Sequence, residues 1–266
     1  MHLFGEGAKV DKDDPVLLQQ LEDLYSVIKT YRPENVYNMD ETGLFFRLLP
    51  RYSLLMPTES LVTTRSKKKS KERVTLVICS NATGSQNTIF YDWKSCTTCL
   101  YSRTWPIPYF CQKNAWMDVS VCQKWLNEVF YPEFKPKNGL PVLLLLDNVP
   151  GNFEAFERNL VKVVFFPPNC TSWKQPCDMG IIAALKKRYK YLYLSDILSY
   201  YSLDVNTKEC LKESSLLCKR GAAGVEYGKP AHLLDAAKYV NLAWKSIQPS
   251  SIKNCFDKAE LFQINK

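Results

Sequence analysis

The feature that most constrains the fold is a run of five apolar residues at positions 142–146, VLLLL. The run is too short for a typical helix and a turn follows at residues 148–151, so we predict a strand buried on both faces, as in a parallel sheet. Asp147 follows the run directly. Because open α/β sheets place ligand-contacting groups at the carboxyl ends of strands, the sequence predicts an α/β fold with a carboxylate at one sheet edge.

Two other aspartates occupy similar positions. Asp40 ends a short strand-like run, and Asp178 opens a segment whose apolar residues recur at helical spacing. Each aspartate alone also fits a structural role, as a helix cap or a turn residue. If Asp40, Asp147 and Asp178 converge, their charges repel one another unless a cation neutralises them, and hard oxygen ligands suit Mg²⁺ or Mn²⁺.

The rest of the chain alternates helical and strand-like patterns, without internal repeats or low-complexity tracts. The periodicity predicts helices over residues 16–30, from 118 or 120 to 132, 153–160 and 233–247, and strands over residues 74–81, 88–93 and 161–166.

Composition narrows the classes of protein. The chain has 266 residues, a net charge of +8 and ten cysteines. The charge favours a polyanionic partner, and no apolar run approaches the roughly 20 residues of a membrane span. The cysteines lack the spacing of a disulfide framework and indicate reduced thiols. Cys96 and Cys99 form a lone Cys-x-x-Cys without a second ligand pair, which makes a zinc or thiol-redox protein a poor alternative.

Three blocks of sequence resemble a known family. They read NMDETGL at residues 38–44, LDNVPG at 146–151 and PPNCTSWKQPCDMG at 167–180. In this order they resemble the signature blocks of the DDE superfamily endonuclease (transposase) domain of the pogo/Tigger branch, which is related to tigger transposable element-derived, jerky-like and centromere protein B proteins. The resemblance covers nearly the whole chain, with gaps near residues 86–105 and 199–228.

The resemblance implies a ribonuclease H-like α/β fold, in which helices flank a mixed, mostly parallel sheet and a C-terminal helical extension follows. We expect an N-terminal helical lead-in at residues 1–32, a catalytic core at 33–200 and an extension of the same domain at 201–266.

The resemblance also implies a chemistry. Asp40, Asp147 and Asp178 would be catalytic and would hold two Mg²⁺ or Mn²⁺ ions about 3.5–4 Å apart, for cutting and joining phosphodiester bonds in DNA. Glu41 and Asn148 are candidates for orienting these carboxylates.

The predicted partner is DNA. The densest basic run spans residues 64–73, which indicates either contact with DNA phosphates or a solvated loop. The predicted DNA-contacting residues are Lys67, Lys68, Lys69, Lys71, Arg73, Lys186 and Lys187. We expect a nuclear protein that contacts no membrane and possibly forms a homodimer, and we expect the family's sequence-reading helix-turn-helix domain to be absent from this chain.

Departures from the family pattern leave two alternatives open. Asn152 stands where the family usually has a histidine, Cys177 and Met179 flank the third aspartate, and residues 86–105 match poorly. One alternative is a catalytically silent, domesticated module that associates with DNA or with proteins. The other is a metal-dependent nuclease that cleaves DNA without joining strands.

Overall fold

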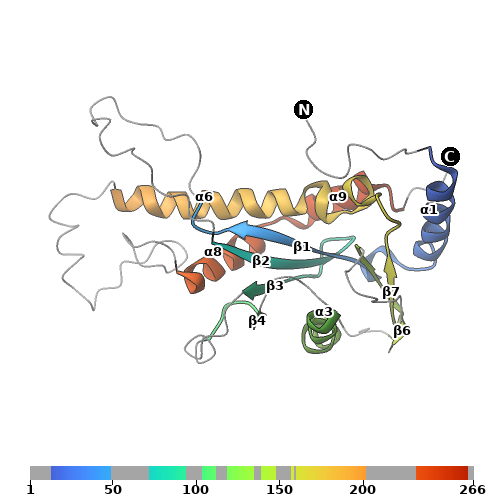
Figure 1. Ribbon diagram of the computed structural model, residues 1–266, viewed down its shortest axis with the longest axis horizontal. Helices are drawn as coiled ribbons and strands as arrows, with labels where there is room; N and C mark the ends of the chain where they lie inside the picture. Colours follow the sequence, from blue (N-terminus) through green and yellow to red (C-terminus); the bar gives the residue numbers. More distant parts are fainter. Residues whose placement is uncertain are drawn as a thin grey trace.

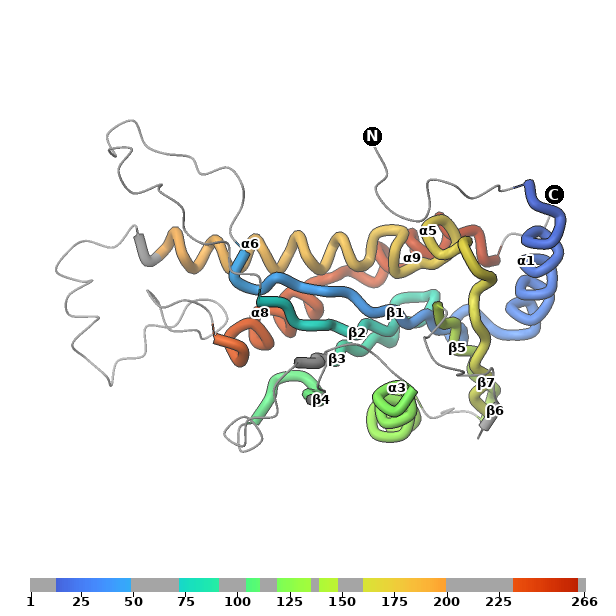
Figure 2. Tube along the Cα trace, viewed as in Figure 1, coloured from blue at the N-terminus to red at the C-terminus, as the bar shows by residue number. Residues whose placement is uncertain are grey.

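The computed structural model describes residues 13–48, 72–93, 104–111, 119–134, 139–147, 157–158, 160–201 and 232–262. The described elements form three layers, in which helices lie on both sides of a central sheet (Figures 1 and 2). None of the helices in these ranges is long and apolar enough to cross a membrane.

The sheet contains seven strands in the described residues, in the order β4-β3-β2-β1-β5-β7-β6. Their bounds are β1 Val36–Phe45, β2 Arg73–Asn81, β3 Asn87–Trp93, β4 Tyr109–Cys111, β5 Val142–Leu146, β6 Glu157–Arg158 and β7 Val161–Phe165. Three of the six strand pairings are parallel and three are antiparallel. The sheet is therefore mixed, as predicted, but it is not mostly parallel. A short turn joins β2 to β3, and such a connection can only pair strands antiparallel.

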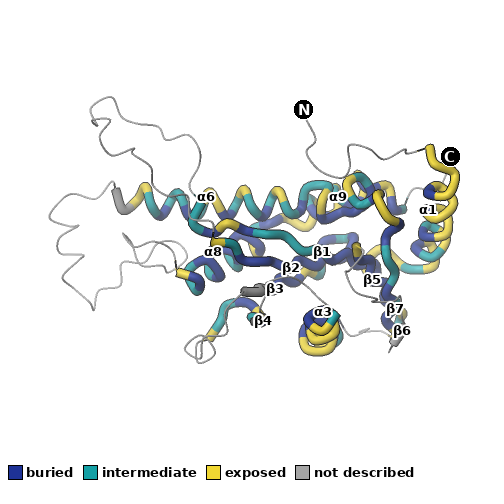
Figure 3. Tube along the Cα trace, viewed as in Figure 1, coloured by how far each residue is buried: buried dark blue, intermediate teal, exposed yellow. Residues whose placement is uncertain are grey.

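One helical layer consists mainly of α6 (Ile182–Tyr201), α8 (Leu233–Lys245) and α9 (Pro249–Ala259). Its buried side chains form one apolar cluster with those of α1 (Pro15–Ile28) and of one face of β1, β2 and β5. Asp14 caps α1, because its Oδ1 accepts a hydrogen bond from the Val16 backbone N–H at 3.0 Å. Helices α1 and α8 confirm the helices predicted near both ends of the chain, and Figure 3 shows their buried sides.

The opposite layer contains α3 (Val119–Trp125), the π-helical turn η4 (Leu126–Phe130) and α4 (Tyr131–Glu133). Its core is aromatic, and Figure 1 shows α3 across the sheet from α6. The Phe130 ring lies 5.6 Å from Tyr37, 5.3 Å from Trp125 and 5.1 Å from Phe134, measured between centroids. These distances are typical of tilted aromatic packing.

The helix predicted over residues 153–160 is wrong at the positions that the structure describes. Glu157 and Arg158 form β6, which pairs antiparallel with Val161 and Lys162 of β7. Leu160 adopts a left-handed conformation with φ of 66°, which allows the tight reversal between the two strands. Residues 151–156 and 159 lie outside the described ranges.

Three short segments complete the described elements: η2 (Pro33–Asn35), α5 (Thr171–Lys174) and the π-helical turn η5 (Cys177–Ile181). Helix η5 leads into α6, so the segment between β7 and α6 is bent rather than one regular helix. Gly180, inside η5, has φ of 149°, a conformation that side-chain-bearing residues rarely adopt. A Cβ atom at this position would also come 3.2 Å from Cys255 Sγ.

Candidate metal centre

Asp40 and Asp147 are neighbours across two parallel strands. In the register of β1 and β5, Met39 is the partner of Leu146. Asp40 and Asp147 each follow by one residue. Because neighbouring strands lie about 4.8 Å apart, this register brings the two backbones side by side at the carboxyl end of β5.

The two aspartates also share a face of the sheet. Val36 of β1 and Leu145 of β5 belong to the apolar cluster on the α6 side. Since side chains alternate along a strand, Asp40 and Asp147 lie on that same side. This is the side on which the third aspartate, Asp178, enters through η5.

A buried hydrogen bond fastens η5 to β1. The backbone N–H of Cys177, the residue before Asp178, donates to Asn38 Oδ1 at 2.9 Å. Asn38 is the residue two positions before Asp40 and is fully buried. The bond therefore holds the start of η5 against the strand that carries Asp40.

The three carboxylates influence one another's protonation. The pKa of Asp40 is raised from 3.8 to about 8, first by burial, next by the charge of Asp178, and to a smaller extent by Asp147. The pKa of Asp178 is also raised, by burial and then by Asp147. Like charges this close favour the neutral form of one of the acids. The fold thus brings together all three aspartates from three separate parts of the sequence.

Lys186, which was predicted to contact DNA, lies beside these acids. It is half-buried on α6, and the charges of Asp40 and Asp178 act to raise its pKa. Burial and the charge of Lys190 outweigh them, so that the pKa of Lys186 is lowered. Lys187, the other predicted residue on this helix, is exposed.

Glu41 contacts the site through its backbone. Its N–H donates to Asp40 Oδ1 at 2.7 Å, which lowers the pKa of Asp40. Its side chain belongs to the opposite face of β1 by alternation. There, burial and then the charge of Glu41 raise the pKa of Cys122 on α3.

The predicted residues Asn148, Lys67, Lys68, Lys69 and Lys71 lie outside the described ranges. Arg73 begins β2 as the register partner of Phe45 and is half-buried. Its side chain crosses Gly43, where an added Cβ would come 2.7 Å from Arg73 Cδ.

Two buried amides at the site were not predicted. Asn38 makes the hydrogen bond to η5, and Gln175 is fully buried two residues before the start of η5. Gln175 lies close enough to Asp40 to lower its pKa, yet neither of its amide atoms has regular hydrogen-bond geometry with a described residue. The available signal was a polar residue at an inward position of a strand, between the apolar residues Val36 and Met39.

The model of the DDE superfamily endonuclease family matches residues 71–256, which is more than half of the chain. The chain belongs to this family.

Similar proteins agree with this assignment. Tigger transposable element-derived protein 4 of Mus musculus is 25% identical over 87% of this chain and 40% of its own length. CENP-B homolog protein 2 of Schizosaccharomyces pombe is 28% identical over 99% of this chain and 48% of its own length. The chain thus spans less than half the length of these curated relatives.

A solved structure confirms the predicted fold. The crystal structure of the Mos1 strand transfer complex superposes with a TM-score of 0.50 and 12% identity, over 97% of this chain and 62% of that one. At this identity the likeness shows the fold alone, which is the ribonuclease H-like arrangement of a mixed sheet and flanking helices.

The residues of this DDE domain fit a hard divalent cation. The site combines three carboxylates that repel one another with a buried Gln175 amide that lies beside Asp40 and lowers its pKa, although its hydrogen-bond geometry is irregular. Such oxygen donors are those that Mg²⁺ and Mn²⁺ prefer, and a cation relieves the repulsion that raises the pKa of Asp40. In the described ranges, no three acidic, histidine or cysteine side chains are already gathered tightly enough to hold one metal ion.

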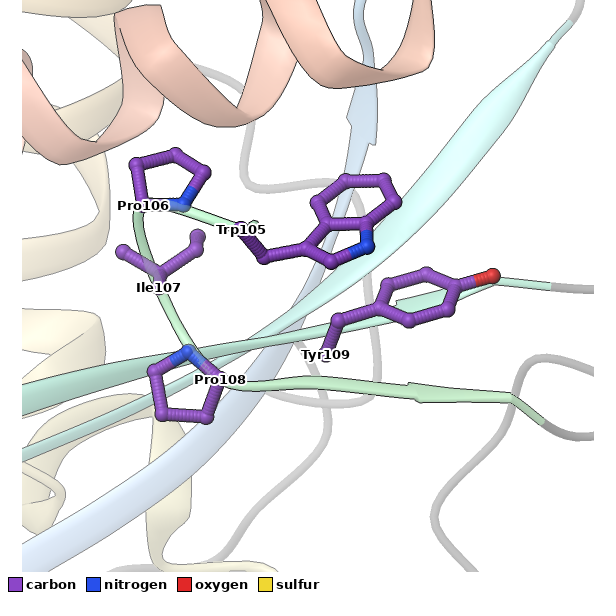
Figure 4. A pocket seen from close by; sticks show the side chains of 5 residues that line it. All are labelled: Trp105, Pro106, Ile107, Pro108 and Tyr109. Atoms are coloured by element: carbon purple, nitrogen blue, oxygen red, sulfur yellow. The ribbon is translucent and has the colours of Figure 1, made fainter. Parts of the chain in front are cut away.

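An aromatic pocket is formed by another part of the chain. It measures about 450 Å³ and is lined by Trp105, Pro106, Ile107, Pro108 and Tyr109 (Figure 4). The Trp105 and Tyr109 rings stack with centroids 4.2 Å apart and planes 5° from parallel. None of the predicted site residues lines this pocket.

Proposed function

We propose that this chain is a DDE endonuclease-type domain that binds DNA and cuts and joins its phosphodiester bonds with Mg²⁺ or Mn²⁺. The observation that carries the proposal is the mutual influence of Asp40, Asp147 and Asp178, where the middle of β1 lies beside the carboxyl end of β5. Repulsion among these carboxylates lowers the stability of the fold unless a cation neutralises them. In a domain of the endonuclease family, that cation would serve the cleavage of phosphodiester bonds.

In this proposal, Asp40, Asp147 and Asp178 hold the cations. When bound, two divalent ions supply an activated oxygen nucleophile and a counter-charge for the leaving oxygen. The Glu41 N–H donates to one oxygen of Asp40, which fixes that side of the carboxylate. Lys186, next to these acids on α6, is placed to pair with the phosphate that enters beside them.

DNA binding would rest on exposed basic side chains such as Lys187 and on the basic run of the sequence. Lys187 is exposed one residue from Lys186, and the basic run ending at Arg73 precedes β2. Contacts between lysine and phosphate release counterions, so affinity falls steeply with salt. We expect Lys187→Ala to lower the slope of log affinity against log salt by about one contact, that is by ~0.9. Filter binding of a labelled duplex at several salt concentrations measures this slope, with Lys29→Ala on α1 as the matched control.

We extend the proposal to a nuclear location, since DNA is the expected substrate, and to a possible homodimer that brings two DNA ends together. We also propose the division into a lead-in at residues 1–32, a core at 33–200 and a helical extension of the same domain at 201–266. The shared apolar cluster of α1, α6, α8 and the sheet supports one continuous domain.

A second candidate function is a DNA-associated module without turnover. The observation that favours it is Lys186, whose positive charge interacts with both Asp40 and Asp178. A lysine in this place partly neutralises the acids without a metal ion. A chain that relied on it could keep the fold and its DNA contacts while losing catalysis.

One experiment separates these functions. Supercoiled plasmid is incubated with the purified chain and Mn²⁺, beside Asp147→Asn and the exposed-charge control Asp23→Asn. We expect nicked, linear and joined products from wild type and Asp23→Asn, and a loss of at least about 100-fold in Asp147→Asn, in the range found for parts of a catalytic unit.

Other product patterns identify the alternatives. Nicked and linear DNA without joined species would assign a nuclease that does not join strands. A folded wild type that binds DNA but neither binds Mn²⁺ nor yields products would overturn the catalytic proposal in favour of the silent module. Circular dichroism of each variant confirms that it is folded.

A further inference from the structure

One side chain contacts all three segments that carry the aspartates. The Asn38 amide accepts from the Cys177 N–H at 2.9 Å and donates through Nδ2 to the Leu145 carbonyl oxygen at 3.1 Å. Asn38 stands two residues before Asp40, and Leu145 two residues before Asp147. Cys177 directly precedes Asp178. Each aspartate therefore lies within two positions, in sequence, of Asn38 or of a residue to which the Asn38 amide is hydrogen-bonded.

The contacts of Asn38 extend beyond these two bonds. Its Nδ2 also lies 3.3 Å from the Met39 carbonyl oxygen, and Cys177 Sγ donates to the Asn38 backbone carbonyl oxygen at 3.8 Å. Both the side chain and the backbone of Asn38 therefore engage the segments around it. A fully buried amide with its donor and acceptor both satisfied fixes the relative position of its partners, because any shift leaves a polar group unpaired.

An apolar residue would satisfy packing at this position. Inward-facing neighbours in the same layer, such as Val36, Ile78 and Leu143, are all apolar and almost fully buried. Asn38 and its register partner Ser80 on β2 are both polar and fully buried on this face. Ser80 Oγ has no described hydrogen-bond partner, whereas the Asn38 amide accepts from the Cys177 N–H of η5. Burial alone does not explain an amide at this position, because a leucine side chain of similar size has a more favourable free energy of transfer from water into the core.

We propose that Asn38 is a positioning residue for the carboxylate site. Its amide sets the separation between Asp178, on η5, and the pair formed by Asp40 and Asp147 on the sheet. The three segments that carry the aspartates are thereby fixed relative to one another before a cation or DNA arrives. The inference rests on the proposed function where it treats the three aspartates as cation ligands, and its first test below is independent of that function.

The first test measures local opening of η5 in the metal-free 266-residue chain. Amide hydrogen exchange at Cys177 and Asp178 is followed by nuclear magnetic resonance in wild type, Asn38→Leu and the milder Asn38→Ser. The matched control is Tyr239→Phe, which removes another buried hydrogen bond, from the Tyr239 hydroxyl to Asp196 at 2.8 Å.

We expect Asn38→Leu and Asn38→Ser to accelerate exchange at Cys177 about tenfold more than exchange in β5, as befits the loss of one hydrogen bond. Tyr239→Phe should change the exchange rate at Cys177 and the exchange rates in β5 by the same factor. Exchange at Cys177 that follows only global unfolding in the Asn38 variants would overturn the inference. So would failure of both Asn38 variants to fold while Tyr239→Phe folds, since Asn38 would then serve folding as a whole.

The second test measures the consequence for cation binding. Calorimetric titration of Mn²⁺ is carried out on the same proteins under conditions in which each is fully folded. Loss of a residue that orients metal ligands typically weakens binding by about 10- to 100-fold, and we expect this range for Asn38→Leu and less than about twofold for Tyr239→Phe.

The two tests fail in distinguishable ways. Equal Mn²⁺ affinity in wild type and Asn38→Leu would overturn the positioning role. A folded wild type that binds no Mn²⁺ would instead overturn the proposed function, and hydrogen exchange at Cys177 would still decide whether Asn38 positions η5.

Discussion

The two faces of β1 carry side chains of opposite character. On one face, Tyr37 and Met39 pack into the aromatic core beneath α3. On the other face, Asn38 and Asp40 lie on the side of η5. The Asn38 amide is hydrogen-bonded to the backbone of Cys177 and of Leu145, and the raised pKa of Asp40 favours its neutral form. Alternation along a single strand separates these two environments by one residue.

The difference shows how stability and chemistry divide within this fold. The aromatic face gains from every contact, because its side chains are apolar and close-packed. The η5 face combines repelling acids with a buried Gln175 amide whose hydrogen-bond geometry is irregular, and each of these lowers the stability of the metal-free fold. Functional sites commonly lower stability in this way, and the rest of the core compensates. Substitutions in the aromatic core and substitutions of the repelling acids should therefore change stability in opposite directions.

The largest effect is expected on the aromatic face. Phe130 is fully buried and packs against four other aromatic rings, so Phe130→Ala should lower the free energy of unfolding by ~3–5 kcal/mol. Urea denaturation measures this loss, and Phe130→Leu should lose less. The Mn²⁺ affinity of the folded fraction should stay within about twofold of wild type. A large loss of affinity in a folded Phe130→Leu variant would contradict the division between the faces.

The second effect has the opposite sign. Asp40→Asn removes a buried negative charge that repels Asp178 and Asp147, and each unit by which its pKa is raised corresponds to ~1.4 kcal/mol. After allowance for solvent near the half-buried group, we expect metal-free Asp40→Asn to be more stable than wild type by ~1–3 kcal/mol at pH 8. Differential scanning calorimetry in chelator measures this gain, with Asp23→Asn on α1 as control. Mn²⁺ binding should be lost in the same variant, and a lower melting temperature than that of wild type would refute the prediction.

The same group predicts a pH dependence. The pKa of Asp40 rises from 3.8 in the unfolded chain to about 8 in the fold, so the folded state binds more protons between these values. The unfolding free energy of wild type should therefore fall as pH rises from about 4 to 8, relative to that of Asp40→Asn. Below about pH 4 the two proteins should be equally stable, and above about pH 8 their difference should be constant. Urea denaturation in chelator across this range measures the difference, and a constant gap at all pH values would contradict the prediction.

Much of this arrangement could be predicted from sequence, because strands and aspartates leave local signals. The apolar run before Asp147 indicated a doubly buried strand, and the register of β1 and β5 places Asp40 beside that strand's end. The three family-like blocks predicted Asp178 as the third aspartate of the site, with Asp40 and Asp147. These signals are short-range patterns of hydrophobicity, which a single sequence contains in full.

What could not be predicted depends on partners distant in sequence. Asn38 gives no local sign that it bonds to Leu145 and Cys177, which lie 107 and 139 residues away. Glu157 and Arg158 fit a helix locally, but pairing with β7 overrides that preference.

The smallest effect tests the buried Gln175 amide. Gln175 is fully buried, and neither of its amide atoms has regular hydrogen-bond geometry with a described residue, although the residue lies beside Asp40. Gln175→Met keeps a similar volume and removes a buried amide whose only described interaction, with Asp40, has irregular hydrogen-bond geometry, so we expect metal-free stability to rise by ~1 kcal/mol. If the amide instead completes its hydrogen bonds through water on a bound cation, the same variant should bind Mn²⁺ several-fold more weakly. Thermal unfolding with and without Mn²⁺ separates these contributions: the variant should melt higher than wild type in chelator and should gain less on addition of Mn²⁺. A variant that melts at a lower temperature than wild type in chelator would show that the Gln175 amide stabilises the metal-free fold, and would contradict this prediction.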